Sequence, residues 1–138
     1  NSFGGKKVSD LNSSLKEADI VSLSLPKNEK TINLISLDEM KIMKKNSILI
    51  NVSRGGIVNE KDLDFALNNK LIFFAGIDVF EKEPPDKTNP LLSNKRVLLS
   101  PHAATFTKEC LENMSIETVN NIIDFFEKRI DKSKIVKL

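Results

Sequence analysis

The sequence is poor in cysteine and histidine and has no long apolar run. It holds one Cys and one His among 138 residues. That composition excludes an intrachain disulfide and a structural zinc site built from these ligands. A membrane-spanning helix needs about 20 consecutive apolar residues, whereas the longest apolar stretches here are short, as in residues 71–75. We also find no signal peptide pattern, and we expect a cytoplasmic protein.

The charge balance is nearly even. Lys and Arg number 21 and Asp and Glu 19, which gives a formal net charge of +2. This bias is too weak to indicate a nucleic acid or an anionic membrane as a partner. Apolar residues make up 40% and charged residues 29% of the chain, as is typical of a globular domain with one hydrophobic core.

Short apolar, β-branched runs alternate with segments of helical periodicity. This alternation favours an α/β fold with a mostly parallel sheet. The expected strands are residues 19–25, 47–52, 73–79 and 96–100, and the expected helices are residues 10–18, 36–44, 59–68 and 107–128. The last three strands are nearly continuous apolar runs, which is typical of parallel strands covered by helices on both faces.

Polar residues mark where each helix should begin. Ser9 is the expected N-cap of the first helix, and Ser36 with Glu39 forms a capping box. Asn59 and Thr107 are the expected caps of the third and fourth helices. The fourth helix carries an apolar stripe that we expect to be buried. Its members are Leu111, Met114, Val119, Ile122 and Phe126.

Three chemically complementary residues follow three different expected strands. They are Arg54, Glu83 and His102, and ligands of parallel α/β sheets bind outside the carboxyl ends of the strands. A guanidinium binds a carboxylate through two parallel hydrogen bonds, and an imidazole beside a carboxylate exchanges protons near neutral pH. The set suits proton transfer at a carbonyl next to a carboxylate. Each residue alone also fits an ordinary surface or structural role.

Several segments resemble signature motifs of the D-isomer-specific 2-hydroxyacid dehydrogenase family. They are residues 50–60 (INVSRGGIVNE), residues 76–85 (GIDVFEKEPP), and residues 89–92 followed by 98–104. Residues 18–26 and 37–44 are similar to the family in order and spacing. The resemblance extends over nearly the whole chain, to about Phe126, and the ordered set of motifs makes it specific.

The resemblance implies a doubly wound (Rossmann) parallel α/β sheet with flanking helices. The chain has no Gly-x-Gly-x-x-Gly motif, so the N-terminal βαβ portion that carries it would lie upstream of Asn1. Residues 1–105 would be the C-terminal half of the NAD-binding domain. Residues 106–138 would form a long helix and tail that pack back towards the substrate domain. The family also implies a homodimer.

The same resemblance implies a role for each residue of the trio. Arg54 would bind the carboxylate of a small 2-oxo or 2-hydroxy acid. His102 would protonate the carbonyl oxygen as NADH delivers hydride, and Glu83 would hydrogen-bond to His102. No metal is implied. The residues implied to contact the cofactor are Asn1, Leu25, Pro26, Thr31, Val52, Ser53, Arg54, Asp78, His102 and Ala104.

The cofactor and the substrate are not equally well defined by the sequence. NAD is expected, but Asn1 stands where the family usually has an Asp that accepts the ribose hydroxyls, so NADP is less strongly excluded. Phosphoglycerate dehydrogenase, hydroxypyruvate or glyoxylate reductase and D-lactate dehydrogenase types remain open. A dinucleotide-sensing, corepressor-like binding protein of the same fold and an inactive fragment are the alternatives.

The missing glycine motif gives a first testable expectation. Sequencing upstream of Asn1 should find Gly-x-Gly-x-x-Gly directly after a strand pattern, about twenty residues before Asn1, because that is its usual spacing to the ribose-binding residue. Any other sequence in that stretch would contradict the cofactor assignment.

Overall fold

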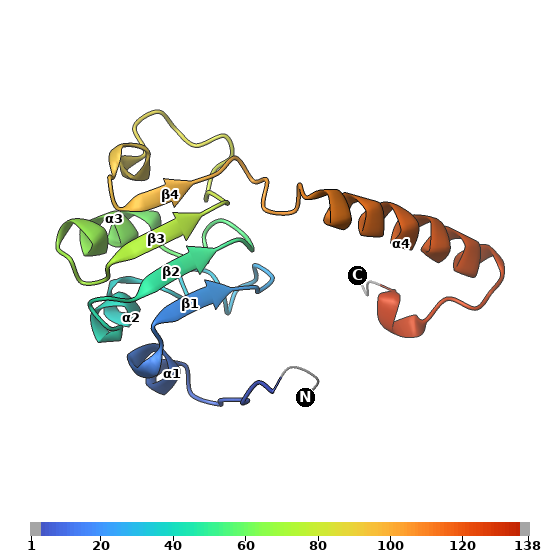
Figure 1. Ribbon diagram of the computed structural model, residues 1–138, viewed down its shortest axis with the longest axis horizontal. Coiled ribbons are helices and arrows are strands. Elements are labelled where there is room, and N and C mark those ends of the chain that lie inside the picture. The colour runs from blue at the N-terminus through green and yellow to red at the C-terminus, as the bar shows by residue number, and fades with distance from the viewer. Residues whose placement is uncertain (1–3, 136–138) are drawn as a thin grey trace. The chain divides into compact units, whose positions relative to one another are not determined.

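The computed structural model describes residues 4–135, which fall into two compact units. The first ends at His102 and the second begins at Ala103. The first unit contains a parallel sheet with its connecting helices, and the second contains one long helix (Figure 1).

Four short strands form the sheet in the order of the chain. They are β1 (Ile20–Leu23), β2 (Ile48–Asn51), β3 (Phe74–Ile77) and β4 (Val97–Leu99). All three pairings are parallel, with Ile20 opposite Ile48, Ile48 opposite Phe74 and Ala75 opposite Val97. The predicted parallel α/β fold is therefore confirmed, although each strand is shorter than its apolar run.

Three helices cover one face of this sheet. They are α1 (Leu11–Glu17), α2 (Leu37–Ile42) and α3 (Glu60–Asn68), and they lie next to one another behind the strands (Figure 1). Successive right-handed crossovers that advance in one direction place their helices on the same face. Since the strand order never reverses among these four strands, the connecting helices α2 and α3 lie on the same face, and α1, which precedes β1, packs against α2.

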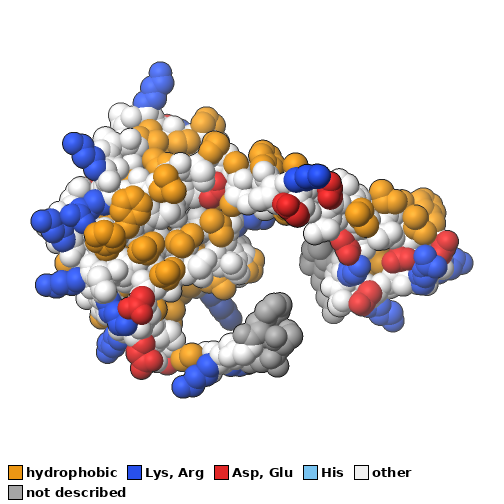
Figure 2. Space-filling model, viewed as in Figure 1, with side chains coloured by type: hydrophobic (Ala, Val, Ile, Leu, Met, Phe, Trp, Pro, Cys, Tyr) orange, Lys and Arg blue, Asp and Glu red, His pale blue; other side chains and the backbone are white. Residues whose placement is uncertain are grey.

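Within residues 4–102 no helix lies on the other face of the sheet, here called the open face, so the helices expected on both faces are found on one face of this unit. Side-chain burial alternates along β2 and β3, where Leu49, Asn51, Ala75 and Ile77 are buried and their neighbours are partly exposed. On the open face Leu98 is 70% exposed. Figure 2 shows hydrophobic side chains spread across the first unit.

The hydrophobic core lies between the covered face of the sheet and the three helices. Leu63, Ala66 and Leu67 of α3 are fully buried, as their spacing predicted. The short helix η1 (Pro90–Ser93) adds Leu91 to the same core. Other fully buried members are Leu15, Ile35, Met40, Leu49, Ile57 and Ile72.

The helix caps agree with the sequence in three of four cases. Glu39 accepts a hydrogen bond from the backbone N–H of Ser36 (3.0 Å), and Asn59 accepts one from Asp62 (3.0 Å). Thr107 accepts one from the N–H of Cys110 at 3.1 Å. The prediction for α1 is wrong by one residue, because Asp10 and not Ser9 provides the cap.

In the second unit α4 (Lys108–Phe126) has no buried residue. The prediction that its apolar stripe is buried is therefore wrong for this chain. Exposure along the stripe runs from 47% at Leu111 to 77% at Phe126. The helical periodicity was real, but no segment within residues 103–135 buries the stripe.

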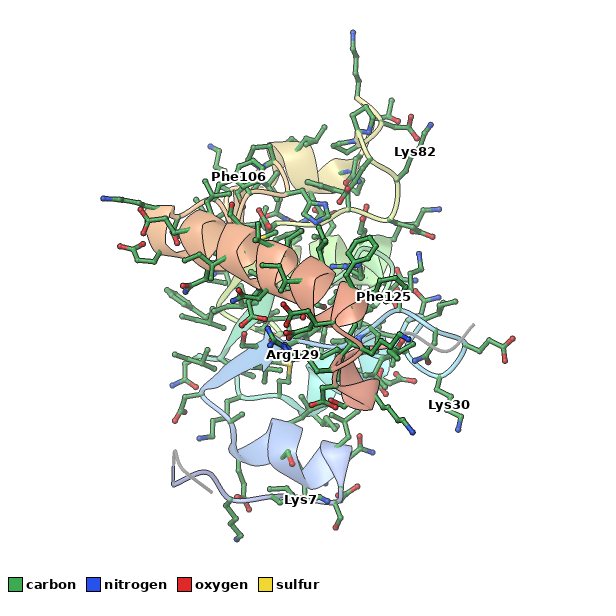
Figure 3. All side chains as sticks on the ribbon, turned by 90° about the vertical axis from the view of Figure 1, so that its right-hand side faces the viewer. Lys7, Lys30, Lys82, Phe106, Phe125 and Arg129 are labelled. Carbon is green, nitrogen blue, oxygen red and sulfur yellow. The ribbon has the colours of Figure 1, made fainter. Side chains whose placement is uncertain are left out.

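The segment after α4 is partly folded back on the helix. Arg129, labelled in Figure 3, donates from Nε to Asp124 at 2.7 Å. Lys134 is the last residue of the short helix η2 (Lys132–Lys134), and its Nζ lies 3.3 Å from a Glu117 carboxylate oxygen. None of the helices within residues 4–135 is long and apolar enough to cross a membrane.

The structure of the core predicts that two residues of α3 contribute very differently to the free energy of unfolding. Leu63 is fully buried, whereas Phe65 two residues later is 50% exposed. Leu63→Ala should lower the free energy of unfolding by about 2–5 kcal/mol, because it leaves a cavity in the core. Phe65→Ala is the control and should lower the free energy of unfolding clearly less. Urea titration of both variants measures the difference. Equal losses would contradict this description of the core.

Candidate active site at the carboxyl edge of the sheet

The turn after β2 is built around the buried side chain of Asn51. Its Oδ1 accepts hydrogen bonds from the backbone N–H of Ser53 (3.1 Å) and from the Ser53 hydroxyl (2.8 Å). Its Nδ2 donates to the carbonyl of Arg54 at 3.0 Å. Asn51 was part of a recognised motif but had no predicted role. A polar residue closing an apolar run was the only signal for it.

Glycine is required where this turn meets the segment after β3. A Cβ placed on Gly55 would lie 1.7 Å from the carbonyl oxygen of Phe80. No side chain can be accommodated at that distance, so the two turns can approach only through glycine. The close contact brings the backbone after Arg54 against the segment that carries Glu83.

The Arg54 guanidinium is exposed at this edge of the sheet. Its Nη1 donates to the carbonyl of Ser53 at 2.6 Å. Within residues 4–135 it forms no ion pair with a carboxylate. The remaining guanidinium donors are therefore available to an anionic ligand.

Glu83 and His102 form a direct pair. Nδ1 of His102 lies 2.8 Å from Oε2 of Glu83, and Oε1 of Glu83 accepts from the backbone N–H of Phe80 at 3.0 Å. Because an ionised carboxylate only accepts hydrogen bonds, Nδ1 carries the proton and Nε2 is left for other partners. The two side chains remain accessible, with exposures of 49% for His102 and 38% for Glu83.

The backbone holds His102 in a conformation that few residues adopt. Its φ is 54°, in the left-handed region where His is enriched, and its N–H donates to the carbonyl of Asp78 at 2.8 Å. Asp78 is buried, and its carboxylate accepts from the Ser100 hydroxyl at 2.5 Å. Ser100 thus links the turns after β3 and β4, a role that the sequence did not reveal.

The Glu83 carboxylate is stabilised in its ionised form. The hydrogen bond from His102 is the largest cause that lowers the pKa of Glu83, and the N–H of Phe80 lowers it further. Desolvation and the negative charge of Asp78 oppose these effects but do not cancel them. Glu83 therefore stays charged at a pH where an ordinary glutamate would begin to protonate.

A small cavity brings the three predicted catalytic residues together. It has a volume of about 210 Å³, and Arg54, Glu83 and His102 line it together with Lys27, Gly55, Phe80 and Glu81. Lys27 was not predicted, and its only signal was a charge directly after Pro26. Within residues 4–135 no group of three potential ligands is arranged to hold a metal ion.

A second cavity collects several of the predicted cofactor contacts. Its volume is about 530 Å³, and it lies between the ends of β1 and β2. The lining residues are Ser24, Leu25, Pro26, Lys27, Val52, Ser53 and Arg54. It combines the exposed apolar side chains of Leu25 and Val52 with polar and cationic groups. This mixture fits a ligand with flat rings and anionic groups.

Thr31 and Ala104, which were also predicted to contact the cofactor, are not among the residues that line this cavity. The Thr31 hydroxyl donates to the carbonyl of Pro26 at 2.8 Å and accepts from the N–H of Asn28 at 2.8 Å, so it closes the loop after β1. Ala104 belongs to the second compact unit. Asn1 lies outside the described residues.

A parallel α/β sheet with polar side chains gathered at its carboxyl edge defines the class of nucleotide-binding α/β domains. Residues 2–104 match the family model described as D-isomer specific 2-hydroxyacid dehydrogenase, NAD binding domain. The chain belongs to this family.

Individual relatives agree with the family match. The chain is 39% identical over 126 residues to a glyoxylate reductase of Aeropyrum pernix, covering 91% of this chain and 38% of the relative. It is 43% identical over 108 residues to a D-3-phosphoglycerate dehydrogenase of Methanocaldococcus jannaschii, covering 78% of this chain and 20% of the relative. The chain therefore spans well under half the length of these relatives.

A solved structure supports the same fold. The NAD-complexed D-isomer specific 2-hydroxyacid dehydrogenase of Lactobacillus delbrueckii ssp. bulgaricus superimposes with a TM-score of 0.80 at 30% identity. The match covers 92% of this chain and 43% of that one. The predicted Rossmann-type α/β architecture is thus confirmed.

The lowered pKa of Glu83 can be measured directly. The stability that its ionisation contributes is present above the ordinary glutamate pKa and is lost as pH falls through the lowered value. His102→Gln removes the imidazole that contributes most to the lowered pKa of Glu83. In a carbon NMR titration of the Glu83 carboxyl, the inflection should therefore move to higher pH in this variant. Lys82→Met is the control, since Lys82 pairs with Asp86 instead. An unchanged inflection in His102→Gln would show that the pair is not formed.

Proposed function

We propose that the protein carrying this chain is an NAD-dependent oxidoreductase acting on a small D-2-hydroxy acid and its 2-oxo acid. The observation that carries the proposal is the Glu83–His102 pair, joined at 2.8 Å in the same cavity as the available Arg54 guanidinium. The names of the relatives, a glyoxylate reductase and a D-3-phosphoglycerate dehydrogenase, support this substrate class.

Each residue of the trio has a distinct task in this proposal. Arg54 binds the substrate carboxylate through two parallel hydrogen bonds and orients the neighbouring carbonyl. His102 donates the Nε2 proton to the carbonyl oxygen as that oxygen becomes a hydroxyl, and it takes the proton back in the oxidative direction. Glu83 holds the imidazole by Nδ1 and stabilises its protonated form. NADH supplies the hydride when it is bound.

The cofactor is proposed to lie along the carboxyl edge of the sheet. Leu25, Pro26, Val52 and Ser53 would contact it from the cavity between β1 and β2. Asp78 would lie at its nicotinamide end. Asn1, Thr31 and Ala104 are further proposed contacts, and NADP is the alternative cofactor because Asn1 is uncharged.

The wider setting of the protein is also proposed. Residues 1–105 would be the C-terminal half of the NAD-binding domain, and residues 106–138 would pack towards a substrate domain. A homodimer in the cytoplasm fits the family expectation, the single cysteine and the uncovered apolar stripe of α4.

Loss of the proton donor should remove most of the activity. His102→Gln in the full-length protein should lower kcat about 10²–10⁴-fold, the usual contribution of general acid catalysis. Steady-state reduction of glyoxylate and 3-phosphohydroxypyruvate with NADH would measure this loss. Dinucleotide binding without turnover of any 2-oxo acid by the unmodified protein would overturn the proposal and favour a dinucleotide-sensing role.

The geometry of the guanidinium should matter as much as its charge. Arg54→Lys should raise KM for the 2-oxo acid and lower kcat/KM at least about tenfold, because a lysine cannot form the paired hydrogen bonds. Arg96→Lys is the matched control, since Arg96 precedes β4 and donates to the carbonyl of Phe73. Equal kinetics for the two variants would exclude Arg54 as the carboxylate-binding residue.

A further inference from the structure

Glu60, the first residue of α3, is bonded to two segments far along the chain. One carboxylate oxygen accepts from the backbone N–H of Glu81, and the other accepts from Nδ2 of Asn89, each at 2.5 Å. These partners lie 21 and 29 residues away in the sequence. Asn89 in turn uses its Oδ1 to cap η1 through the N–H of Leu91 at 3.0 Å.

The segment fixed by Glu60 is the one that carries Glu83. Glu81 is two residues from Glu83, and Glu83 is bonded back to the N–H of Phe80 at 3.0 Å. On its other side the carbonyl of Phe80 lies against Gly55, where a Cβ would not fit. Residues 80–83 are thus held between the turn after β2 and the Glu60 carboxylate.

We infer that Glu60 is a positioning residue, which acts through the backbone of residues 80–83 to keep the Glu83 carboxylate on Nδ1 of His102. The inference rests on the proposed function. Glu60 is not among the residues that line the catalytic cavity, so it does not touch the reacting atoms. Its effect reaches His102 only through the placement of Glu83.

A structural role of Glu60 alone would have different consequences. An acidic residue in the first turn of a helix stabilises that helix through the helix dipole. Asp62 is a second acid in the same turn, and its carboxylate accepts from the backbone N–H of Leu37 at 3.0 Å, which joins α3 to α2. Asp62 therefore shares the helix-stabilising role of Glu60 without any bond to residues 80–83.

Several charged groups besides Glu83 surround the imidazole. Lys27, Arg54 and Glu81 line the same cavity, and Asp78 provides the carbonyl that accepts from the N–H of His102. Replacing Glu60 leaves all of them in the chain. Asp62→Ala removes one negative charge from the same helix turn, so a change in pH dependence that occurs in the Glu60 variants but not in Asp62→Ala reports the placement of residues 80–83.

The test compares Glu60→Ala, Glu60→Gln and Asp62→Ala in the full-length enzyme, with kcat and KM for glyoxylate reduction measured from about pH 6 to about pH 9. Glu60→Ala should lower kcat roughly threefold to tenfold, a part of the effect of a general acid. It should also move the alkaline limb of the kcat profile to lower pH, because a displaced carboxylate stabilises the imidazolium less. KM should change little, since Arg54 is untouched.

The other variants separate positioning from stability. Glu60→Gln keeps an acceptor for one of the two bonds and loses the other. Its alkaline limb should therefore still move to lower pH, but by less than the limb of Glu60→Ala. Asp62→Ala should reduce the melting temperature but leave the alkaline limb in place. If Glu60→Ala fails to fold, the profile of Glu60→Gln decides, and an unshifted limb in that variant overturns the inference.

The outcomes also distinguish this inference from the proposed function. No turnover of any 2-oxo acid by the unmodified enzyme would mean that the proposed function is wrong. Normal turnover by the unmodified enzyme, with the same pH profile in Glu60→Ala and Asp62→Ala, would leave the function intact and overturn the role of Glu60.

Discussion

Parallel pairing of the strands is the constraint on which the rest of this structure depends. Because β1 to β4 all run in one direction, their carboxyl ends meet at one edge of the sheet. Residues that follow different strands, such as Arg54, Glu83 and His102, are thereby brought to one cavity although they are distant in the sequence. Antiparallel pairing of any strand would send its turn to the opposite edge and disperse the group.

Polar side chains then set the geometry of that edge, and Asn51 and Asp78 among them are buried. Asn51 shapes the turn that presents Arg54, Asp78 and Ser100 join the turns before His102, and Glu60 holds the segment of Glu83. A hydrogen bond shielded from water is costly to break, since its groups would be left without partners. The accessible Glu83–His102 pair therefore stands beside turns that are held in part by the buried side chains of Asn51 and Asp78.

The two expectations about burial that proved wrong have a common cause. Apolar periodicity shows which side of an element favours burial, but not whether this chain supplies the covering surface. The open face of the sheet, with Leu98 at 70% exposure, and the stripe of α4, ending at Phe126, both satisfy the pattern without being covered. The misplaced cap of α1 is of a different kind, because Ser9 and Asp10 are both good capping residues and the pattern cannot choose between neighbours.

Local patterns were sufficient to predict the alternation of strands and helices, most of the helix caps and which residues stand at the strand ends. These features depend on periods of two to four residues and on side chains close in the chain, so they can be predicted from the sequence. The family resemblance implied that Glu83 meets His102, but the fold is what joins them across 19 residues, and the contact of Glu60 with Glu81 across 21 residues was not predicted at all. Such bonds depend on where the sheet brings separate turns together, and no local pattern encodes that meeting.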